Sequence, residues 1–259
     1  MRESSEISSE SAATQGNGVQ LTHVPPRGDV YTHKMEVHLG FSPRDCERII
    51  IVGAGGFGRE VLQWTRHAWP GHAHRIAGFL SSDPRRLDGH NCPLAILSDP
   101  EVFVPRHGDG LLLAIGIPVV RRRVTESLIA KGGRFLTLIH PQALIAASAR
   151  VAEGAVICPY AVVSDSASVG RLALLNYHSS LGHDAEVGDF SVLSPYAALG
   201  GGARVADDAF LGFHASVGPG ITVGMGSKLS ANSCALADVP AECIVWGVPG
   251  IARPRLVPA

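Results

Sequence analysis

The second half of the chain repeats with a strict period of six residues. In steps of six from residue 139, sixteen consecutive positions carry leucine, isoleucine or valine. They are Ile139, Ile145, Val151, Ile157, Val163, Val169, Leu175, Leu181, Val187, Leu193, Leu199, Val205, Leu211, Val217, Val223 and Leu229. A fixed period sustained over this length is typical of a repeat architecture, and it constrains the fold more than any other feature of the chain.

A second periodic position supports this interpretation. Four residues after each aliphatic position, fifteen of the sixteen residues are alanine or serine, and Ile221 is the exception. Each hexad therefore predicts one short strand, whose aliphatic residue points inward, and one tight corner that requires a small side chain. Three hexads close one triangular coil, and successive coils stack at about 4.8 Å, the spacing between strands of a sheet.

An ordinary β-sandwich is the alternative, but strands that alternate with a period of two do not predict a strict period of six. The pattern resembles the hexapeptide-repeat left-handed β-helix, and this resemblance is what implies the handedness. We assign residues 139–236 to this β-helix. Residues 237–259 are irregular and are expected to form a C-terminal cap, because the end of a solenoid is an open sheet edge.

The preceding segment, residues 47–138, alternates apolar runs with helical spacing. Strand–helix–strand alternation predicts a small Rossmann-like parallel sheet with helices on both faces. The expected strands are Arg48–Val52, Arg75–Leu80 and Leu111–Gly116, and the expected helices are Phe57–Ala68 and Val119–Lys131. Residues 1–46 are polar without a sustained period, so we expect a disordered extension there.

Composition excludes several classes of function. The 22 Lys and Arg residues nearly balance 23 Asp and Glu residues, so no basic field for nucleic acid is expected. Five cysteines contain no CxxC pair, which argues against a zinc site or a disulfide framework. The apolar runs are too short to span a bilayer, so no membrane partner is expected. The acidic, serine-rich start differs from a secretory signal, and the expected location is the cytoplasm.

His183 is the strongest candidate for chemistry on the β-helix. It follows an inward position, precedes Asp184, and has Asp165 one coil earlier and Gly201 one coil later in the same column. An imidazole that holds a carboxylate on one nitrogen accepts a proton on the other. The backbone of Gly200–Gly202 offers N–H groups to an oxyanion and lets a thioester approach closely. The alternative is a surface histidine at a corner.

A column of aromatic residues is the second candidate. Tyr160, His178, Tyr196 and His214 are each separated by three hexads. We interpret them as a stacked corner ladder rather than as a wall that faces substrate. His178 and His214 lie two coils apart, about 10 Å. Since Zn–N bonds are about 2 Å long, one ion does not bridge the two rings, and no metal is expected.

The first segment contains a glycine-rich turn at Gly53–Gly58. This GxGxxG pattern between a strand and a helix permits close approach of a phosphate to the helix N-terminus. A binding site for NAD requires an acid about twenty residues further on. That position holds Ser81 and Ser82, with Asp83 just beyond, so an oxidoreductase is the less favoured interpretation.

Five segments together resemble the NeuD-type sialic acid O-acetyltransferase family of sugar acyltransferases. That family includes N-acetyltransferases that act on nucleotide-linked 4-amino sugars. The resemblance covers residues 48–255. It rests on IIIVGAGGFGREVL at 49–62, LLLAIGIPVVRRR at 111–123, IHPQALIAASARVAEGAVI at 139–157, NYHSSLGHDAEVGDFSVLSP at 176–195 and GVPGIARP at 247–254.

The resemblance implies acetyl transfer from acetyl-CoA in a homotrimer, with the site between neighbouring β-helices. His183 matches the catalytic base and Asp184 the acid that orients it. Gly201, beside the thioester, is assigned to CoA binding together with Gly202 and Asn176. The sugar-nucleotide region is matched by Gly53, Gly55, Gly58, Asp83 and Gly116. Some members carry a second histidine nine residues after the base, where this chain has Val192.

The expected function is therefore acetyl transfer to a hydroxyl or amine of a sugar or nucleotide sugar, by direct attack with His183 as general base. The departure at Val192 argues against the amino-sugar subgroup more than against acyl transfer itself. The alternative is a non-catalytic scaffolding protein whose first domain senses a nucleotide. That alternative predicts ligand binding by the first domain without binding of acetyl-CoA.

Overall fold

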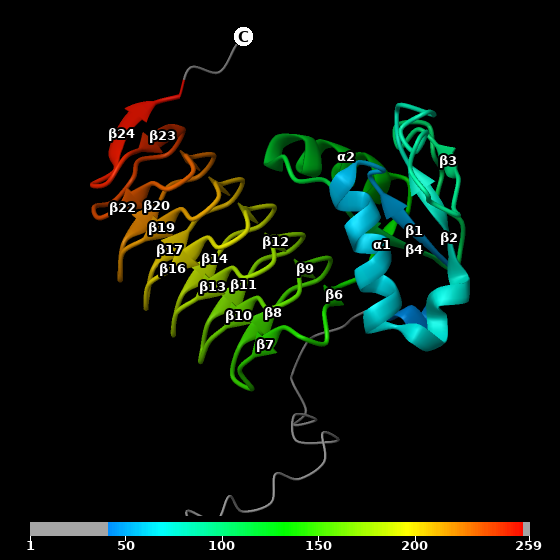
Figure 1. Ribbon diagram of the computed structural model, residues 1–259, viewed down its shortest axis with the longest axis horizontal. Helices are drawn as coiled ribbons and strands as arrows, with labels where there is room; N and C mark the ends of the chain where they lie inside the picture. The colour runs from blue at the N-terminus through cyan, green and yellow to red at the C-terminus, as the bar shows by residue number, and fades with distance from the viewer. Residues whose placement is uncertain (1–40, 256–259) are drawn as a thin grey trace, which may run out of the picture. The chain divides into compact units, whose positions relative to one another are not determined.

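The computed structural model describes residues 41–255 (Figure 1). Its first domain contains a five-stranded parallel sheet in the order β3-β2-β1-β4-β5. The strands are β1 Arg48–Val52, β2 Ile76–Leu80, β3 Ile96–Ser98, β4 Asp109–Leu113 and β5 Arg134–Phe135. The helices are α1 Gly56–Ala68 and α2 Pro118–Ala130, with short 3-10 segments η1 Pro43–Asp45 and η2 Pro70–Arg75. The expected alternation is confirmed, whereas the two outer strands, β3 and β5, were not expected.

The two helices cover opposite faces of this sheet. Alternate β1 residues divide between two apolar clusters, one shared with Val61 and Leu62 of α1 and the other with Val124 and Leu128 of α2. Burial on both faces explains why β1 is an unbroken aliphatic run. Because the connections leave β1 and β4 toward opposite sides, their carboxyl ends flank a topological switch point, where open α/β sheets bind ligands.

The second domain is a three-sided parallel β-helix built from two-residue strands. The β6 sheet contains β6 Leu138–Ile139, β9 Val156–Ile157, β12 Leu174–Leu175, β15 Val192–Leu193, β18 Phe210–Leu211 and β21 Lys228–Leu229. The β7 sheet contains β7 Leu144–Ile145, β10 Val162–Val163, β13 Ser180–Leu181, β16 Ala198–Leu199, β19 Ser216–Val217 and β22 Cys234–Ala235. The β8 sheet contains β8 Arg150–Val151, β11 Ser168–Val169, β14 Glu186–Val187, β17 Arg204–Val205 and β20 Thr222–Val223.

The hexad positions occupy the places that the period predicts. Each aliphatic hexad residue is the second residue of its strand, and these residues form one continuous core with the small corner residues. Every third strand pairs in register, for example Leu181 with Val163 and with Leu199. The expected fold, a Rossmann-like domain followed by a left-handed parallel β-helix, is confirmed.

The first domain packs on the outer face of the β6 sheet. Val156, Leu174 and Val192 point outward from that sheet and are buried in the same cluster as Ile49 and Leu62. This packing removes apolar surface of both domains from water, which is the main favourable term for their association.

A buried arginine forms hydrogen bonds between the two domains. Arg121 of α2 is fully buried, and its guanidinium donates to the carbonyl oxygens of Ile115 at 2.6 Å, Leu172 at 2.5 Å and Ala173 at 3.2 Å. Burial lowers the pKa of Arg121 to about 9. Because a buried charge is costly unless its hydrogen bonds are satisfied, these carbonyls hold α2 against one corner of the β-helix.

The ends of the described chain differ from the expectations. Phe41 and Cys46 are buried in the core of the first domain, and the Arg134 guanidinium lies 3.8 Å from the centre of the Phe41 ring. Phe41 and Cys46, expected within the extension, thus belong to the core of the first domain, and residues 1–40 of that extension lie outside the described residues. The cap contains strands β23 Cys243–Trp246, parallel to β21, and β24 Ile251–Pro254, antiparallel to β23.

Within residues 41–255, neither helix has the length and apolar character needed to cross a lipid bilayer.

Candidate active site

His183 and Asp184 form an exposed pair at the corner between β13 and β14. Nδ1 of His183 lies 2.8 Å from Oδ2 of Asp184, and the two side chains are 72% and 65% exposed. Because a carboxylate only accepts hydrogen bonds, Nδ1 carries the proton, and Nε2 of the neutral ring keeps its lone pair. The corner places Asp184 in the left-handed region, with φ of +58°, which turns the chain sharply.

Gly201 leaves room for the imidazole on the next coil. A Cβ atom at this position would lie 2.5 Å from Nε2 and 2.6 Å from Cε1 of His183, so a larger residue would displace the ring. The N–H groups of Gly200 and Gly202 donate to Val217 and to His183. The N–H of Gly201 has no backbone acceptor in the described part of the chain, so a donor for an anion stands beside the nitrogen with the lone pair.

Asp165 does not orient the histidine. Its carboxylate contacts the hydroxyls of Ser148 and Ser166, and its carbonyl oxygen accepts the N–H of Asp184 at 2.9 Å. The sequence spacing allows either Asp184 or Asp165 as the partner of the His183 ring. In the structure the partner is Asp184.

A groove of about 250 Å³ lies where the first domain meets the β6 sheet. We call it the inter-domain groove, and its lining residues are Phe57, Glu60, Gly116, Leu174, Asn176, Tyr177, Val192, Ser194, Pro195, Phe210 and Phe213. It brings together Gly116 and Asn176, which the sequence assigned separately to substrate and to CoA. The Oδ1 of Asn176 accepts the N–H of Tyr177 at 2.8 Å, whereas its NH₂ donates to no described residue.

Glu60 is a groove residue that sequence reasoning missed. It stands on α1, and partial burial raises the pKa of its carboxyl above the ordinary value. A carboxylate in such a place binds hydroxyl or ammonium groups of a ligand. Glu60 follows the GxGxxG motif by two residues. Nothing in that motif indicates that this helix position faces the β-helix.

His183 does not line the inter-domain groove. Asn176 precedes strand β13 and His183 follows it, so the two residues flank one strand from opposite ends. A single copy of the chain therefore presents the imidazole and the groove at different corners of the β-helix.

The glycine turn has a structural basis at two of its positions. Gly53 has φ of +113°, and a Cβ there would lie 2.6 Å from the Ala114 carbonyl oxygen. A Cβ at Gly58 would lie 2.0 Å from the Gly53 carbonyl oxygen. Gly55 is different. It is the N-cap residue of α1 and provides no side-chain cap. The Arg86 guanidinium lies 3.8 Å from the position that a Cβ atom of Gly55 would occupy.

The remaining predicted substrate residues lie around the same sheet edge. Gly116 follows β4 next to the turn, and a Cβ there would meet no atom within 4 Å. Asp83 follows β2, and its carboxylate accepts the N–H of Arg85 at 3.0 Å, which closes a local turn. The glycines, Asp83 and Gly116 therefore follow the carboxyl ends of β1, β2 and β4.

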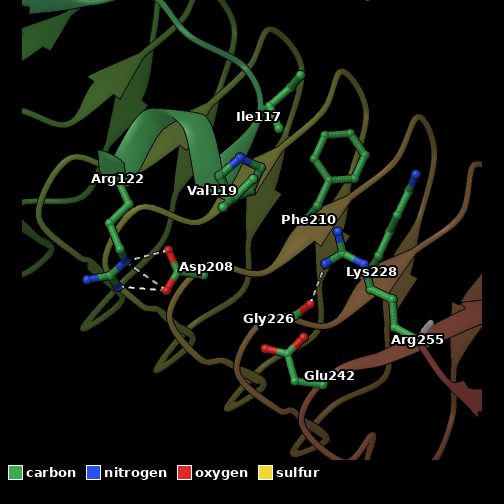
Figure 2. Close-up of a pocket in the computed structure, with 10 residues that line it drawn as sticks. Ile117, Val119, Arg122, Asp208, Phe210, Gly226, Lys228, Glu242 and Arg255 are labelled. Carbon is green, nitrogen blue, oxygen red and sulfur yellow. Dashed lines mark hydrogen bonds and ion pairs between the residues drawn. The ribbon is translucent and has the colours of Figure 1, made fainter. Parts of the chain in front are cut away.

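A second cavity of about 500 Å³ lies between the start of α2 and the β6 sheet (Figure 2). We call it the α2 cavity, and its lining residues are Ile117, Pro118, Val119, Arg122, Asp208, Phe210, Gly226, Lys228, Glu242 and Arg255. Arg122 pairs with Asp208 at 2.7 Å, and Nη1 of Arg255 donates to the Gly226 carbonyl oxygen at 2.9 Å. No sequence motif indicated this cavity.

The aromatic column forms the expected stacked ladder. Ring centres lie 5.0 Å apart for Tyr160 and His178, and 4.7 Å apart for His178 with Tyr196 and for Tyr196 with His214. No group of three or more His, Cys, Asp or Glu side chains suited to a metal ion occurs within residues 41–255.

Comparison with known proteins first concerns the sequence. Residues 48–128 match the family model of the PglD N-terminal domain. The chain is also 30% identical over 116 residues to UDP-N-acetylbacillosamine N-acetyltransferase of Bacillus subtilis (strain 168). That match covers 43% of this chain and 51% of the relative, so it spans about half the length of the curated relative.

Solved structures are similar over both domains. PerB from Caulobacter crescentus, in complex with CoA and GDP-perosamine, is 27% identical with a TM-score of 0.71, over 80% of this chain and 97% of that one. The acetyltransferase domain of PglB from Neisseria gonorrhoeae FA1090, in complex with acetyl coenzyme A, is 25% identical with a TM-score of 0.73, over 80% and 100%.

The names of these relatives refine the expected resemblance. The Bacillus relative is named as an N-acetyltransferase, and so is perosamine N-acetyltransferase from Caulobacter crescentus, which is 26% identical in a variant with one histidine replaced. The comparisons thus point toward N-acetyltransferases and do not support the sialic acid O-acetyltransferase specificity. The first domain is similar to the PglD N-terminal domain, and the described chain as a whole has the two-domain fold of these acetyltransferases.

Proposed function

We propose that the protein transfers an acetyl group from acetyl-CoA to an amine of a nucleotide-linked sugar, with a hydroxyl as the alternative acceptor. The observation that carries this proposal is the His183 ring, whose Nδ1 is held by Asp184 and whose Nε2, beside Gly201, has no hydrogen-bond partner among residues 41–255. Relatives that contain CoA with GDP-perosamine, or acetyl coenzyme A alone, support the choice of donor and acceptor.

The mechanism follows from the two ring nitrogens. Nε2 of His183 takes a proton from the acceptor as the acceptor attacks the thioester carbonyl. Asp184 stabilises the imidazolium that forms, and the N–H of Gly201 donates to the oxygen that becomes negative. The new C–N or C–O bond replaces the C–S bond, and the proton passes to the departing thiolate. Direct transfer needs no covalent enzyme intermediate, because both substrates are held together.

We propose that the site is completed in a homotrimer. The three outer faces of the β-helix differ, because the first domain covers the β6 sheet. The β8 sheet presents mostly charged or hydroxyl residues: Arg150, Ser168, Glu186, Arg204 and Thr222. The β7 sheet presents small or apolar residues: Leu144, Val162, Ser180, Ala198, Ser216 and Cys234.

The β7 sheet is therefore the face suited to pack against a second copy, since small side chains permit close approach. Asn176 and His183 stand at the two ends of β13 in this sheet. In such an assembly His183 of one copy faces the inter-domain groove of its neighbour, which explains why one chain presents them apart.

The acceptor is assigned to the inter-domain groove and the glycine turn. The switch point between β1 and β4 suits the nucleotide, with Gly53, Gly55, Gly58 and Gly116 around it and Asp83 at the end of β2. The groove contains Glu60, which suits the ammonium form of an amine or a sugar hydroxyl. Val192 adds an apolar wall where some members of the family carry histidine. Asn176, Gly201 and Gly202 are assigned to the donor.

Mass spectrometry of reaction products tests the function. The protein is incubated with acetyl-CoA and each of three acceptor classes: nucleotide-linked amino sugars, nucleotide sugars without an amine, and free sugars. We expect a mass gain of one acetyl group in the first class. Calorimetry with acetyl-CoA separates this proposal from a binding-only protein. Binding of a nucleotide sugar without binding of acetyl-CoA, and without product, would show that the protein is not an acetyltransferase.

A further inference from the structure

The α2 cavity is twice the volume of the inter-domain groove and differs from it in character. Four apolar residues, Ile117, Pro118, Val119 and Phe210, line one side of it, which we call the near wall. Figure 2 shows Ile117, Val119 and Phe210. Residues Ile117 and Val119 are 59% and 65% exposed, and contact of their apolar side chains with water is unfavourable. An apolar ligand in the cavity would therefore remove the surface of these two aliphatic residues, at the start of α2, from water.

The cavity and the groove are neighbours. Phe210 lines both, and Gly116 of the groove precedes Ile117 of the cavity in the chain. Val192, Phe210 and Lys228 occupy the same position on three paired strands of the β6 sheet. Since paired strands lie about 4.8 Å apart, the path from the groove at Val192 to the cavity at Lys228 is about 10 Å long.

The opposite side of the cavity is charged: two of its five charged side chains pair with each other, a third donates to a backbone carbonyl, and Glu242 and Lys228 have no ion-pair partner among the described residues. Arg122 is paired with Asp208, and Arg255 donates to the Gly226 carbonyl oxygen. The Lys228 ammonium lies 5.5 Å from the centre of the Phe210 ring, so its stem extends the apolar wall. A sugar or a phosphate needs several free hydrogen-bonding groups, and the near wall offers none. A hydrocarbon chain matches that wall.

From these features we propose that the α2 cavity binds the acyl chain of the donor, and that the enzyme accepts acyl-CoA with linear chains longer than acetyl. This inference rests on the proposed function. The chemistry is unchanged: the thioester C–S bond breaks, the bond from the acyl carbon to the acceptor forms, and the acceptor proton passes through His183 to the CoA thiolate. Only the group attached to the carbonyl differs, and it extends past Phe210 toward Lys228.

A donor series tests this inference with two readouts. Calorimetry measures binding of acetyl-, butyryl-, hexanoyl- and octanoyl-CoA to the full chain, and transfer assays use the nucleotide-linked amino sugar that accepts acetyl. Burial of one methylene favours binding by about fourfold. We therefore expect affinity and kcat/KM to rise along the series until the chain fills the cavity.

Val119→Trp fills the cavity from its exposed near wall. We expect this variant to lower the ratio of octanoyl to acetyl values, in both readouts, by about tenfold or more, because several methylenes lose their site. The matched control is Val102→Trp. Val102 is 71% exposed in the same domain but does not line the cavity, so the ratio should stay at the wild-type value.

Each result has one interpretation. Transfer of acetyl with rejection of butyryl and longer chains overturns this inference and leaves the proposed function intact. An equal effect of Val119→Trp on all donors, or the same loss in Val102→Trp, also overturns it. If no acyl-CoA binds and no acyl group is transferred, the proposed function fails and the inference fails with it.

Discussion

The two domains present their candidate functional groups in opposite ways. On the β-helix, His183 and Asp184 stand on an exposed corner, where the Asp184 carboxylate contacts one ring nitrogen of His183 and Gly201 leaves room for the ring on the next coil. In the first domain, the glycine turn is packed so tightly that a Cβ atom at Gly53 or Gly58 would overlap backbone atoms. We therefore expect substitutions at the corner to reduce activity with little loss of stability. Substitutions in the turn should reduce both.

Replacement of the candidate base should have the largest effect. His183→Ala removes the group that takes the acceptor proton, so kcat should fall by about 100-fold or more, with little change in thermal stability. Steady-state kinetics with acetyl-CoA and a nucleotide-linked amino sugar measure this change. His107→Ala, at another exposed histidine, is the control. A His183→Ala enzyme with near-normal kcat would rule out the mechanism.

Gly58→Ala should destabilise the first domain. The added Cβ would lie 2.0 Å from the Gly53 carbonyl oxygen, so the turn and α1 must shift. We expect a loss of about 3 kcal/mol in the free energy of unfolding, measured by urea denaturation. Gly71→Ala is the control, because a Cβ at Gly71 meets no atom within 4 Å. Equal stability of the two variants would contradict the tight packing of the turn.

Gly201→Ala should affect activity without comparable loss of stability. Its Cβ would lie 2.5 Å from Nε2 of His183, and the exposed ring is free to swing away. Displacement of a catalytic group by about 1 Å costs roughly 10-fold to 100-fold in rate. We expect that loss in kcat, with a melting temperature close to that of the wild type by calorimetry. A melting temperature that falls as far as in Gly58→Ala would show that the corner is not independent of the core.

The smallest effect concerns pH and a buried histidine at the junction of the domains. His140 is buried, and Nδ1 of His67 lies 3.2 Å from its Nε2. Burial, and secondarily the charge of His67, lowers the pKa of His140 below 6.5. Because the unfolded chain then binds the proton more readily than the folded chain, stability is full above about pH 6.5 and declines as the pH falls below it.

His140→Asn should reduce that decline. Asparagine keeps an acceptor for the N–H of Gln142, which donates to Nδ1 of His140 at 3.1 Å, but it does not titrate. Urea denaturation at pH 7 and pH 5 measures the change in unfolding free energy for both proteins. A decline of the same size in His140→Asn would assign the pH dependence to other groups.

Much of the β-helix was predictable because its contacts are local in the repeat. Each hexad residue meets its equivalents on the adjacent coils, so a period of six is sufficient to name inward residues such as Leu181 and Leu199. The glycine turn was readable in part, because Gly58 is required by the backbone of Gly53 in the same turn, whereas Gly53 packs against Ala114 at the end of another strand. The same local logic placed Gly201 beside His183 one coil apart.

What the sequence by itself determined is thus everything governed by short, repeated separations: the triangular coil, the aromatic ladder and the His183–Asp184 corner. Only the tertiary structure decided the contacts between domains. Arg121 donates to the Leu172 carbonyl oxygen, Glu60 and Asn176 line one groove, and Val119 and Phe210 line one cavity, all at sequence separations that follow no period. Docking of the first domain on one face of the β-helix depends on the fit of two complete surfaces, and no local pattern encodes that fit.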